Sequence, residues 1–279
     1  MENIRFNFRN QLVEIKLPAI MGIINYTPDS YFADSRVKSI EQAVKKVESM
    51  INDGAAIIDI GAESTRPQST PLTAEEEIGR LSKVLPCIRK EFPKILISID
   101  TYHAQTAKYA IDEGADIIND ISSGLMDPEI ITTVANAHIP YIAMHMQGTP
   151  STMQINPHYN DVIEEINYFF SERLHILSDM GIHDIIIDPG FGFGKTIEHN
   201  YKILNHLKEF TIHNRPILVG LSRKSMIYKA LDISPDNALC PTSALNLQAL
   251  INNADILRVH DVKEANYIIQ LYNLLITNK

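Results

Sequence analysis

The sequence predicts an α/β protein, a single (β/α)8 (TIM) barrel with an N-terminal β-hairpin, in which residues 1–279 form one domain. Three observations predict this fold. Eight short apolar runs recur along the chain, amphipathic segments with helix-capping signals separate them, and several helix-to-strand joints resemble one another. A chain of 279 residues with 45% hydrophobic residues is long enough for one such barrel.

The eight apolar runs are near-continuous in hydrophobicity and do not alternate with polar residues. This pattern is typical of parallel strands that are covered on both faces, whereas the strands of an antiparallel sandwich alternate. The runs are AIMGIIN (19–25), AIIDIG (56–61), ILISID (95–100), DIINDI (116–121), PYIAMH (140–145), DIIIDP (184–189), PILVGL (216–221) and DILRVH (255–260).

The segments between these runs carry helix-start signals. Thr73 and Glu76 have the spacing of a capping box, and Asp261 with Glu264 repeats that spacing before the last segment. Pro128 stands at a first-turn position, where its missing N–H costs nothing. Strand and helix therefore alternate along the chain.

The joints between helix and strand form a sequence repeat. Residues 54–59, 114–119 and 253–258 share a Gly or Asn followed by Ala and an apolar pair, and residues 181–188 are a looser copy. Such a repeat over the whole length, without a linker-like stretch, favours a barrel over a doubly wound open sheet. Before the first run, residues 4–18 predict a hairpin that covers the bottom of the barrel.

Composition limits the partners and the compartment. The chain has 25 Lys and Arg against 34 Asp and Glu, and its net charge of -9 argues against nucleic acid or an anionic membrane as a partner. Cys87 and Cys240 form no CxxC pair, which predicts neither a disulfide framework nor a zinc site. No apolar run has the length of a membrane span and the N-terminus lacks a signal-peptide pattern, so we expect a cytoplasmic protein.

Every predicted strand ends in polar residues. In a barrel these ends meet at one mouth, where essentially all enzymes of this fold have their active sites. The polar residues are Asn25, Asp59 with Glu63, Asp100, Asn119 with Asp120, His145, Asp188, Ser222 to Lys224, and Arg258 with His260.

Individual members of this ring invite different interpretations. Asp100 and Asp188 would need donors in a partly dry mouth, which a donor-rich ligand or the capping of a helix could supply. Asp59 is expected to be structural, and His145 is expected to be a wall residue more readily than a base.

The last two strands gather positive charge in an otherwise acidic chain. Lys224, Arg258 and His260 are cations or potential cations there, where barrels frequently build phosphate sites. The helix that begins near Ser225 would add backbone donors. Anion binding is therefore favoured over solvation of these side chains at the surface.

The glycine-rich segment DPGFGFGKT (188–196) matches neither a Walker A loop nor GxGxxG, because Pro189 and Lys195 stand where Gly is needed. The glycines would instead let the backbone pass close to a flat ligand, with Phe191 or Phe193 against it. The sequence has no dedicated metal motif, although a Mg²⁺ ion carried in by a diphosphate could use one or two oxygen ligands.

Seven segments, in order, resemble the signatures of the dihydropteroate synthase family over nearly the whole chain. They are MGIINYTPDS (21–30), GAESTRPQ (61–68), SIDT (98–101), NDIS (119–122), DPGFGFGK (188–195), GLSRKS (220–225) and RVHD (258–261). The resemblance implies a transferase of folate biosynthesis. Such an enzyme joins (7,8-dihydropterin-6-yl)methyl diphosphate to 4-aminobenzoate and releases diphosphate and 7,8-dihydropteroate.

The resemblance also implies roles for individual residues. The implied pterin-binding residues are Asp100, Asn119, Asp188, Lys224, Met144 and Phe193. The implied diphosphate residues are Asn25, Arg258 and His260, with Asn25 also contacting Mg²⁺, and these three with Lys224 form the implied catalytic set. The implied 4-aminobenzoate residues are Thr65, Arg66, Pro67 and Ser225, and the family implies a homodimer.

The chain departs from the family pattern mainly in its first loop, where Tyr31 and Ala33 replace the usual Phe and Asp, and Asp34 stands one position later. Three alternatives remain open: a pterin-dependent methyltransferase on a similar barrel, a catalytically silent pterin-binding protein, and a sugar-phosphate barrel enzyme. The ESTRP and SRKS segments argue against the first and the retained anion residues against the second. The third gives no role to DPGFGFGK.

Overall fold

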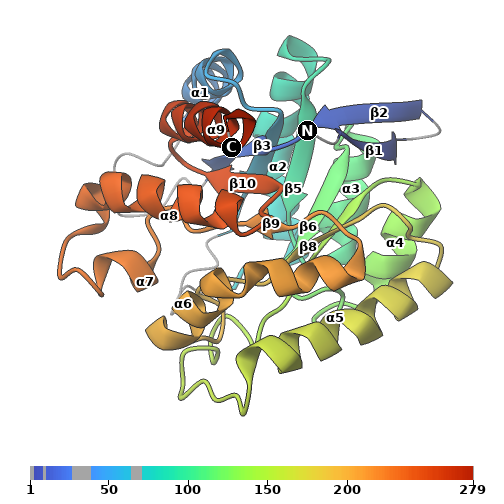
Figure 1. The fold of residues 1–279 in the computed structure, drawn as a ribbon. Helices are drawn as coiled ribbons and strands as arrows, with labels where there is room; N and C mark the ends of the chain where they lie inside the picture. The colour runs from blue at the N-terminus through green and yellow to red at the C-terminus, as the bar shows by residue number, and fades with distance from the viewer. Residues whose placement is uncertain (1–2, 9–10, 27–38, 64–70, 279) are drawn as a thin grey trace.

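The computed structural model describes residues 3–8, 11–26, 39–63 and 71–278, and they form a parallel barrel surrounded by helices (Figure 1). The barrel strands are β3 (Ala19–Asn25), β4 (Ile57–Gly61), β5 (Leu96–Asp100), β6 (Ile117–Asp120), β7 (Tyr141–Met144), β8 (Ile185–Asp188), β9 (Leu218–Val219) and β10 (Ile256–Val259). The α-helices are α1 (Ile40–Asn52), α2 (Ala74–Glu91), α3 (Ala104–Asp112), α4 (Glu129–Ala137), α5 (Val162–Asp179), α6 (Ile197–Asn205), α7 (Ser225–Tyr228), α8 (Leu239–Ile251) and α9 (Val262–Thr277). Two 3₁₀ segments are η1 (Leu207–His213) and η2 (Pro235–Ala238).

The sheet order is β8-β7-β6-β5-β4-β3-β10-β9, and every neighbouring pair is parallel. A parallel bridge between Ile187 and Ile217, with the Ile187 N–H donating to the Pro216 carbonyl at 2.9 Å, joins β8 to the segment before β9 and closes the ring. The eight runs and their order therefore confirm the barrel.

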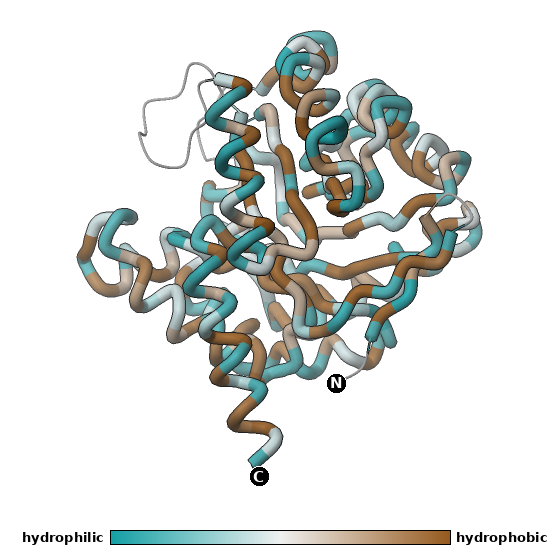
Figure 2. Tube along the Cα trace, turned by 90° about the horizontal axis from the view of Figure 1, so that it is seen from above, coloured by the Kyte–Doolittle hydropathy of each residue, from teal (hydrophilic) through white to brown (hydrophobic). Residues whose placement is uncertain are grey.

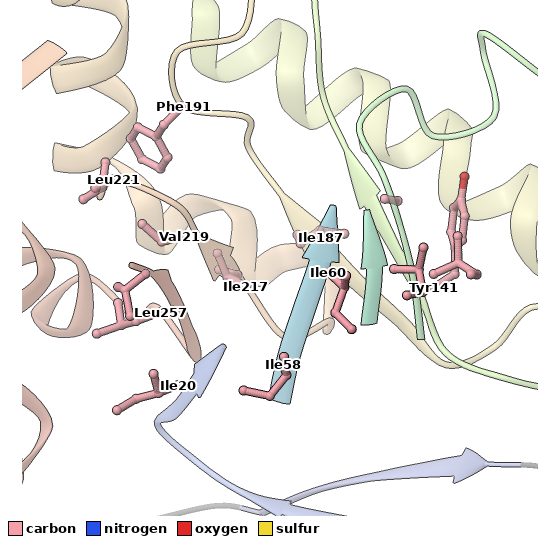
Figure 3. Packing of buried hydrophobic residues seen from close by; sticks show 14 of the residues in the cluster. Ile20, Ile58, Ile60, Tyr141, Ile187, Phe191, Ile217, Val219, Leu221 and Leu257 are labelled. Atoms are coloured by element: carbon pink, nitrogen blue, oxygen red, sulfur yellow. The ribbon is translucent and has the colours of Figure 1, made fainter. Parts of the chain in front are cut away.

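Side chains on the strands alternate between the barrel interior and the helices. Figure 3 shows the outward set, in which Ile58 and Ile60 of β4 and Leu257 of β10 belong to the core cluster shared with the helices. Figure 2 shows hydrophobic residues concentrated in the central strands and alternating colours along the surrounding helices. Each strand therefore places every second residue inside the barrel.

The hairpin of β1 (Asn3–Phe8) and β2 (Gln11–Lys16) covers the N-terminal end of the barrel, as the sequence predicts. Phe6, Phe8 and Ile15 pack in one buried cluster with residues at the starts of the barrel strands, such as Met21 and Ile57. The Asn7 N–H also donates to Asp184 Oδ2 at 2.6 Å, just before β8. This cover leaves the opposite, C-terminal end as the open mouth.

Local signals account for several helix boundaries. The capping box of α2 is present, because the Thr73 side chain accepts from the Glu76 N–H and Glu76 accepts from the Thr73 N–H. At the joint after α1, Gly54 has φ of +105°, and Asn253 adopts the same left-handed region before β10. The repeated joints are thus helix ends that share one backbone conformation.

Two predicted helix starts are corrected. Asp261 precedes α9, yet its side chain makes no capping bond, because Arg223 Nε and Nη2 engage both of its oxygens at 2.9 and 3.1 Å. Pro128 stands at the N-cap of α4, one residue before the first helical position. The spacing of the capping residues therefore predicts where these helices begin. It does not predict whether a side chain forms the capping hydrogen bond or bonds to another residue.

Candidate active site

The parallel register fixes which side chains meet at the mouth. Asn25, Gly61 and Asp100 are register partners across β3, β4 and β5, at the last residue of each strand. A Cβ atom on Gly61 would lie 3.5 Å from Asn25 Oδ1 and 3.6 Å from Asp100 Cβ. The absence of a side chain at Gly61 thus leaves room between an amide oxygen and a carboxylate.

Three of the predicted residues, Asp100, Asn119 and Asp188, lie at the interior-facing ends of β5, β6 and β8. Asp188 is buried, and its Oδ1 accepts from the Gly190 N–H at 2.7 Å. No donor among the described residues engages the other oxygen of Asp188. One carboxylate oxygen is therefore fixed by the backbone and the other is left for a ligand.

Arg258 connects the two halves of the predicted site. Its Nε donates to Asp59 Oδ2 at 2.7 Å and its Nη2 donates to Asp100 Oδ2 at 2.7 Å, from a side chain that is 17% exposed. Asn119 Nδ2 donates to the same Asp59 oxygen at 3.2 Å. The guanidinium of Arg258 thus bonds to two carboxylates at the floor of the site, which is formed by Asp100, Asn119 and Asp188 together. An anion would be a further partner.

Asp59 therefore belongs to the site's hydrogen-bond network. It is fully buried at the middle of β4 and holds both Arg258 and Asn119. Asp59, expected to be structural, holds one residue from each predicted half of the site.

Burial and charge shift the pKa values of these acids. Burial raises the pKa of Asp100 to about 7, against the lowering effect of Arg258 and with Asp59 adding to the rise. Burial also raises the pKa of Asp188, opposed by Lys224 and the Gly190 N–H. Although burial opposes it, Asp59 and Asp100 raise the pKa of Arg258, which stays a cation. Further hydrogen-bond donors, such as those of a ligand, would therefore stabilise the ionised form of these carboxylates.

Lys224 lies at the edge of the floor, immediately before α7. Its Nζ donates to the Phe191 carbonyl at 2.5 Å and lies 4.9 Å from the centroid of the Phe193 ring. Burial lowers the pKa of Lys224 to about 8, against the raising effect of Asp188. Ser225 is the first residue of α7, so it follows directly on this cation.

His260, predicted as a cation or potential cation, lies in a buried setting that disfavours its charged form. Burial and the neighbouring Arg258 lower the pKa of His260 to about 3. Its Nδ1 lies 2.9 Å from Ser222 Oγ, which links the ends of the last two barrel segments. A neutral His260 can donate one hydrogen bond, whereas Arg258 keeps its positive charge.

Met144 and Phe193 belong to one apolar cluster. Met144 is buried in a small apolar cluster with Tyr102 and Met146, and Phe193 packs against that cluster from its partly buried position. Phe191, in contrast, is fully buried in the core between strands and helices. Of the two predicted aromatic candidates, Phe193 is thus the one near the mouth.

Two glycines of the 188–196 segment, Gly190 and Gly194, pack against protein backbone and not against the predicted flat ligand. A Cβ on Gly190, whose φ is +72°, would lie 1.9 Å from the His145 carbonyl oxygen, and one on Gly194 would lie 2.5 Å from the Gln147 carbonyl oxygen. The close approach that requires glycine is therefore to the backbone after β7. At Gly192 the nearest atom is Lys224 Cδ, at 3.4 Å.

Sequence reasoning missed two buried ionisable groups. Lys195 is 3% exposed behind the glycine-rich loop, and its place directly after that loop was the only signal in the sequence. Glu77 is fully buried on α2, where its Oε2 accepts from Thr101 Oγ1 at 2.8 Å and burial raises its pKa to about 7. His145, as expected, is a buried wall residue, and its ring lies edge-on to Phe169.

Some predicted residues lie outside the described part of the chain. These are Thr65, Arg66, Pro67 and the first-loop residues Tyr31, Ala33 and Asp34. Within the described ranges, no group of three or more His, Cys, Asp or Glu side chains could hold a metal ion. Asn25, half-buried beside Gly61, offers a single amide oxygen, which fits an ion held mainly by a substrate's phosphates.

Fold and site together define an α/β-barrel enzyme whose mouth combines buried carboxylate acceptors with the cationic side chain of Arg258. Residues 21–260 match the family of pterin binding enzymes. Dihydropteroate synthase of Escherichia coli K12 is 43% identical over 254 residues, which cover 90% of this chain and 89% of that protein. Dihydropteroate synthase of Haemophilus influenzae is 40% identical and covers 94% and 96%, respectively.

Solved structures agree with these sequence relatives. Yersinia pestis dihydropteroate synthase with a sulfonamide drug superposes with a TM-score of 0.92 at 36% identity, covering 99% of this chain and 100% of that one. The Xanthomonas albilineans enzyme with 4-aminobenzoic acid gives a TM-score of 0.89 at 32% identity, covering 98% of each chain. The chain therefore belongs to the pterin-binding enzyme family and, within it, to the dihydropteroate synthases.

Proposed function

We propose that this chain condenses (7,8-dihydropterin-6-yl)methyl diphosphate with 4-aminobenzoate to give 7,8-dihydropteroate and diphosphate, a step of folate biosynthesis. The observation that carries the proposal is the floor of Asp100, Asn119 and Asp188 beside Lys224 and Arg258. The names of the relatives and the match to pterin binding enzymes support it.

The floor suits the aminopyrimidinone edge of a pterin. That edge presents adjacent N–H donors, and the carboxylate of Asp188 has one oxygen without a donor among the described residues. Each charge-assisted bond contributes about 1.5 to 3 kcal/mol. Asp100 and Asn119 extend the floor, Lys224 reaches the carbonyl side of the ring, and Met144 and Phe193 pack on its faces.

The leaving diphosphate is the main electrostatic problem of the reaction. Arg258 supplies a fixed positive charge and His260 a hydrogen bond, so negative charge that develops on the leaving group meets preorganised partners. Asn25 would hold a Mg²⁺ ion together with the phosphates. Such an ion, when bound, neutralises charge on the diphosphate.

The bond between the pterin methylene carbon and the diphosphate oxygen breaks first and leaves a pterin-stabilised cation. The aromatic amine then forms a C–N bond to that carbon and releases one N–H proton to water. The amine of 4-aminobenzoate is weakly basic and uncharged at neutral pH, so no strong general base is required. Ser225, next to Lys224 at the start of α7, would hold the carboxylate of 4-aminobenzoate. Thr65, Arg66 and Pro67 complete the proposed pocket, although they lie outside the described residues.

The test supplies the dihydropterin diphosphate and Mg²⁺ with and without 4-aminobenzoate, and measures diphosphate and dihydropteroate. The proposal expects dihydropteroate in a one-to-one ratio with diphosphate when both substrates are present. Pterin binding without either product would instead identify a silent binding protein. If a methyl donor is added to the same mixture and methyl groups are transferred, the chain is a methyltransferase.

We further propose that the chain acts as a homodimer in the cytoplasm. Along α9, Tyr267, Leu271, Leu274 and Leu275 are each more than half exposed and recur on one helical face. Exposed apolar side chains in such a stripe favour contact with another apolar surface. Light scattering tests this: Leu274→Glu should convert a dimer to a monomer, and a wild-type monomer would refute it. Among the described helices, none is long and apolar enough to cross a bilayer.

A further inference from the structure

Lys195 is a buried lysine surrounded by uncharged acceptors. Its Nζ lies 2.9 Å from the Gly190 carbonyl oxygen, 3.0 Å from that of Phe193 and 3.2 Å from that of His145. It also lies 3.0 Å from His145 Nδ1, so that nitrogen accepts when it carries no proton. Buried lysines are rare unless paired. Here the partners are three carbonyls and an imidazole, which suggests that the side chain organises backbone.

The backbone that Lys195 organises is the loop from Gly190 to Gly194. Every carbonyl in this loop is engaged by a side chain. Lys195 donates to the carbonyls of Gly190 and Phe193. The carbonyls of residues 191, 192 and 194 accept from Lys224 Nζ, Gln154 Nε2 and Tyr159 Oη, respectively, at 2.5 to 2.8 Å. The loop is thus held from both sides, and the Lys195 amine bridges its carbonyls at Gly190 and Phe193.

The same loop carries three elements of the proposed pterin site. The Gly190 N–H fixes Asp188 Oδ1, the Phe191 carbonyl anchors Lys224 Nζ, and the Phe193 ring faces the Met144 cluster. Lys195 contacts both the residue that orients Asp188 and the residue that bears the aromatic ring. Lys195 itself is only 3% exposed, and its bonds go to the backbone of the loop and to His145.

We propose that Lys195 is a positioning residue for pterin binding, which sets the orientation of Asp188 and Phe193 by holding the carbonyls of the 190–194 loop. The proposal rests on the assignment of this floor to a pterin. It differs from a packing role, because packing alone would destabilise the fold without acting selectively on one substrate.

The test replaces Lys195 with Met, which keeps an unbranched side chain one heavy atom shorter and removes the amine donors. The matched control is Lys202→Met on α6, where an exposed lysine pairs with Asp161. Equilibrium binding of the dihydropterin diphosphate, followed by pterin fluorescence, should weaken at least tenfold in Lys195→Met and stay within twofold in the control. The KM for 4-aminobenzoate at saturating pterin should change less than threefold.

A double-mutant cycle separates positioning from packing. If Lys195 acts through Asp188, the loss caused by Lys195→Met should shrink to less than threefold in an Asp188→Asn background, because the orientation of the carboxylate no longer matters. Losses that multiply, or equal losses for both substrates, would overturn the proposal.

Where Lys195→Met fails to fold, Lys195→Gln keeps two donors and should weaken pterin binding by a smaller but measurable factor. Unchanged pterin binding in that folded variant would also overturn the proposal. Because binding is measured without turnover, these outcomes stay distinct from a failure of the synthase reaction itself.

Discussion

Replacing Asp188 with Asn should abolish most pterin affinity while preserving the fold. In the structure Asp188 Oδ1 accepts from the Gly190 N–H at 2.7 Å, so an Asn must keep its carbonyl oxygen on that side. Its NH₂ group would then face the ligand, where the pterin presents donors of its own. A flipped amide would place the same NH₂ against the Gly190 N–H. Either orientation therefore puts a donor against a donor.

The size of the effect follows from the bonds that are lost. At least one charge-assisted bond of about 1.5 to 3 kcal/mol disappears and a donor is left facing a donor, for a total of about 3 kcal/mol. That figure corresponds to roughly a 150-fold increase in Kd. Because Asn is nearly isosteric with Asp, the melting temperature should change little.

Calorimetry or pterin fluorescence measures the Kd, with Asp161→Asn as the matched control. Asp161 caps α5 at a half-exposed position, and Asn is an equally good N-cap residue. The control should bind the pterin as the wild type does. If Asp188→Asn binds within threefold of the wild type, Asp188 does not accept from the pterin and the site as described is wrong.

Four further predictions concern charge at the mouth and on α2. The kcat/KM for the pterin substrate should be bell-shaped in pH, falling below about 7 as Asp100 is protonated and above about 8 as Lys224 loses its proton; a flat profile from pH 6 to 9 would contradict both assignments. Asp59→Asn should move the acid limb to lower pH, because Asp59 helps to raise the pKa of Asp100; an unmoved limb in a folded variant would refute that coupling. Lys224→Ala should lower kcat at least 100-fold in steady-state assays, and retention of a tenth of the activity would exclude Lys224 from the reaction. Glu77 has a folded pKa of about 7, above its ordinary 4.5, so its stabilising contribution is present below about 4.5 and lost as pH rises through 7. The free energy of unfolding of the wild type should therefore fall between pH 5 and pH 8, and Glu77→Gln should make this fall smaller by about 3 kcal/mol in urea titrations. A fall that the substitution leaves unchanged would show that other groups cause it.

The barrel could be predicted because its signals are local. Near-continuous apolar runs and repeated helix-to-strand joints both follow from parallel strands buried on two faces. The shortest strand shows the limit of this reasoning. Residues 216–221 predict a full strand, yet β9 spans only Leu218–Val219, because ladder pairing depends on neighbours that the run itself does not specify.

The location of the site was predictable for the same reason, since topology brings the strand ends together. The pairing within it was not. Arg258 and Asp59 are 199 residues apart in the chain, and only the closed ring brings the guanidinium to that carboxylate. The sequence therefore assigned Arg258 to the anion side alone and left Asp59 out of the network.

Two further errors have the same physical origin, a competing partner that sequence spacing cannot reveal. Asp261 has the spacing of a capping residue, but Arg223 takes its oxygens. The glycines at 190 and 194 suggested a flat ligand, but the backbone after β7 occupies the space beside them.

The measurement that tests the central claim most directly is product formation by the purified chain. With dihydropterin diphosphate, Mg²⁺ and 4-aminobenzoate, we expect dihydropteroate and diphosphate in equal amounts, and no dihydropteroate from a mixture that lacks 4-aminobenzoate. The absence of dihydropteroate with both substrates present, from a folded chain that binds the pterin, would contradict the synthase assignment.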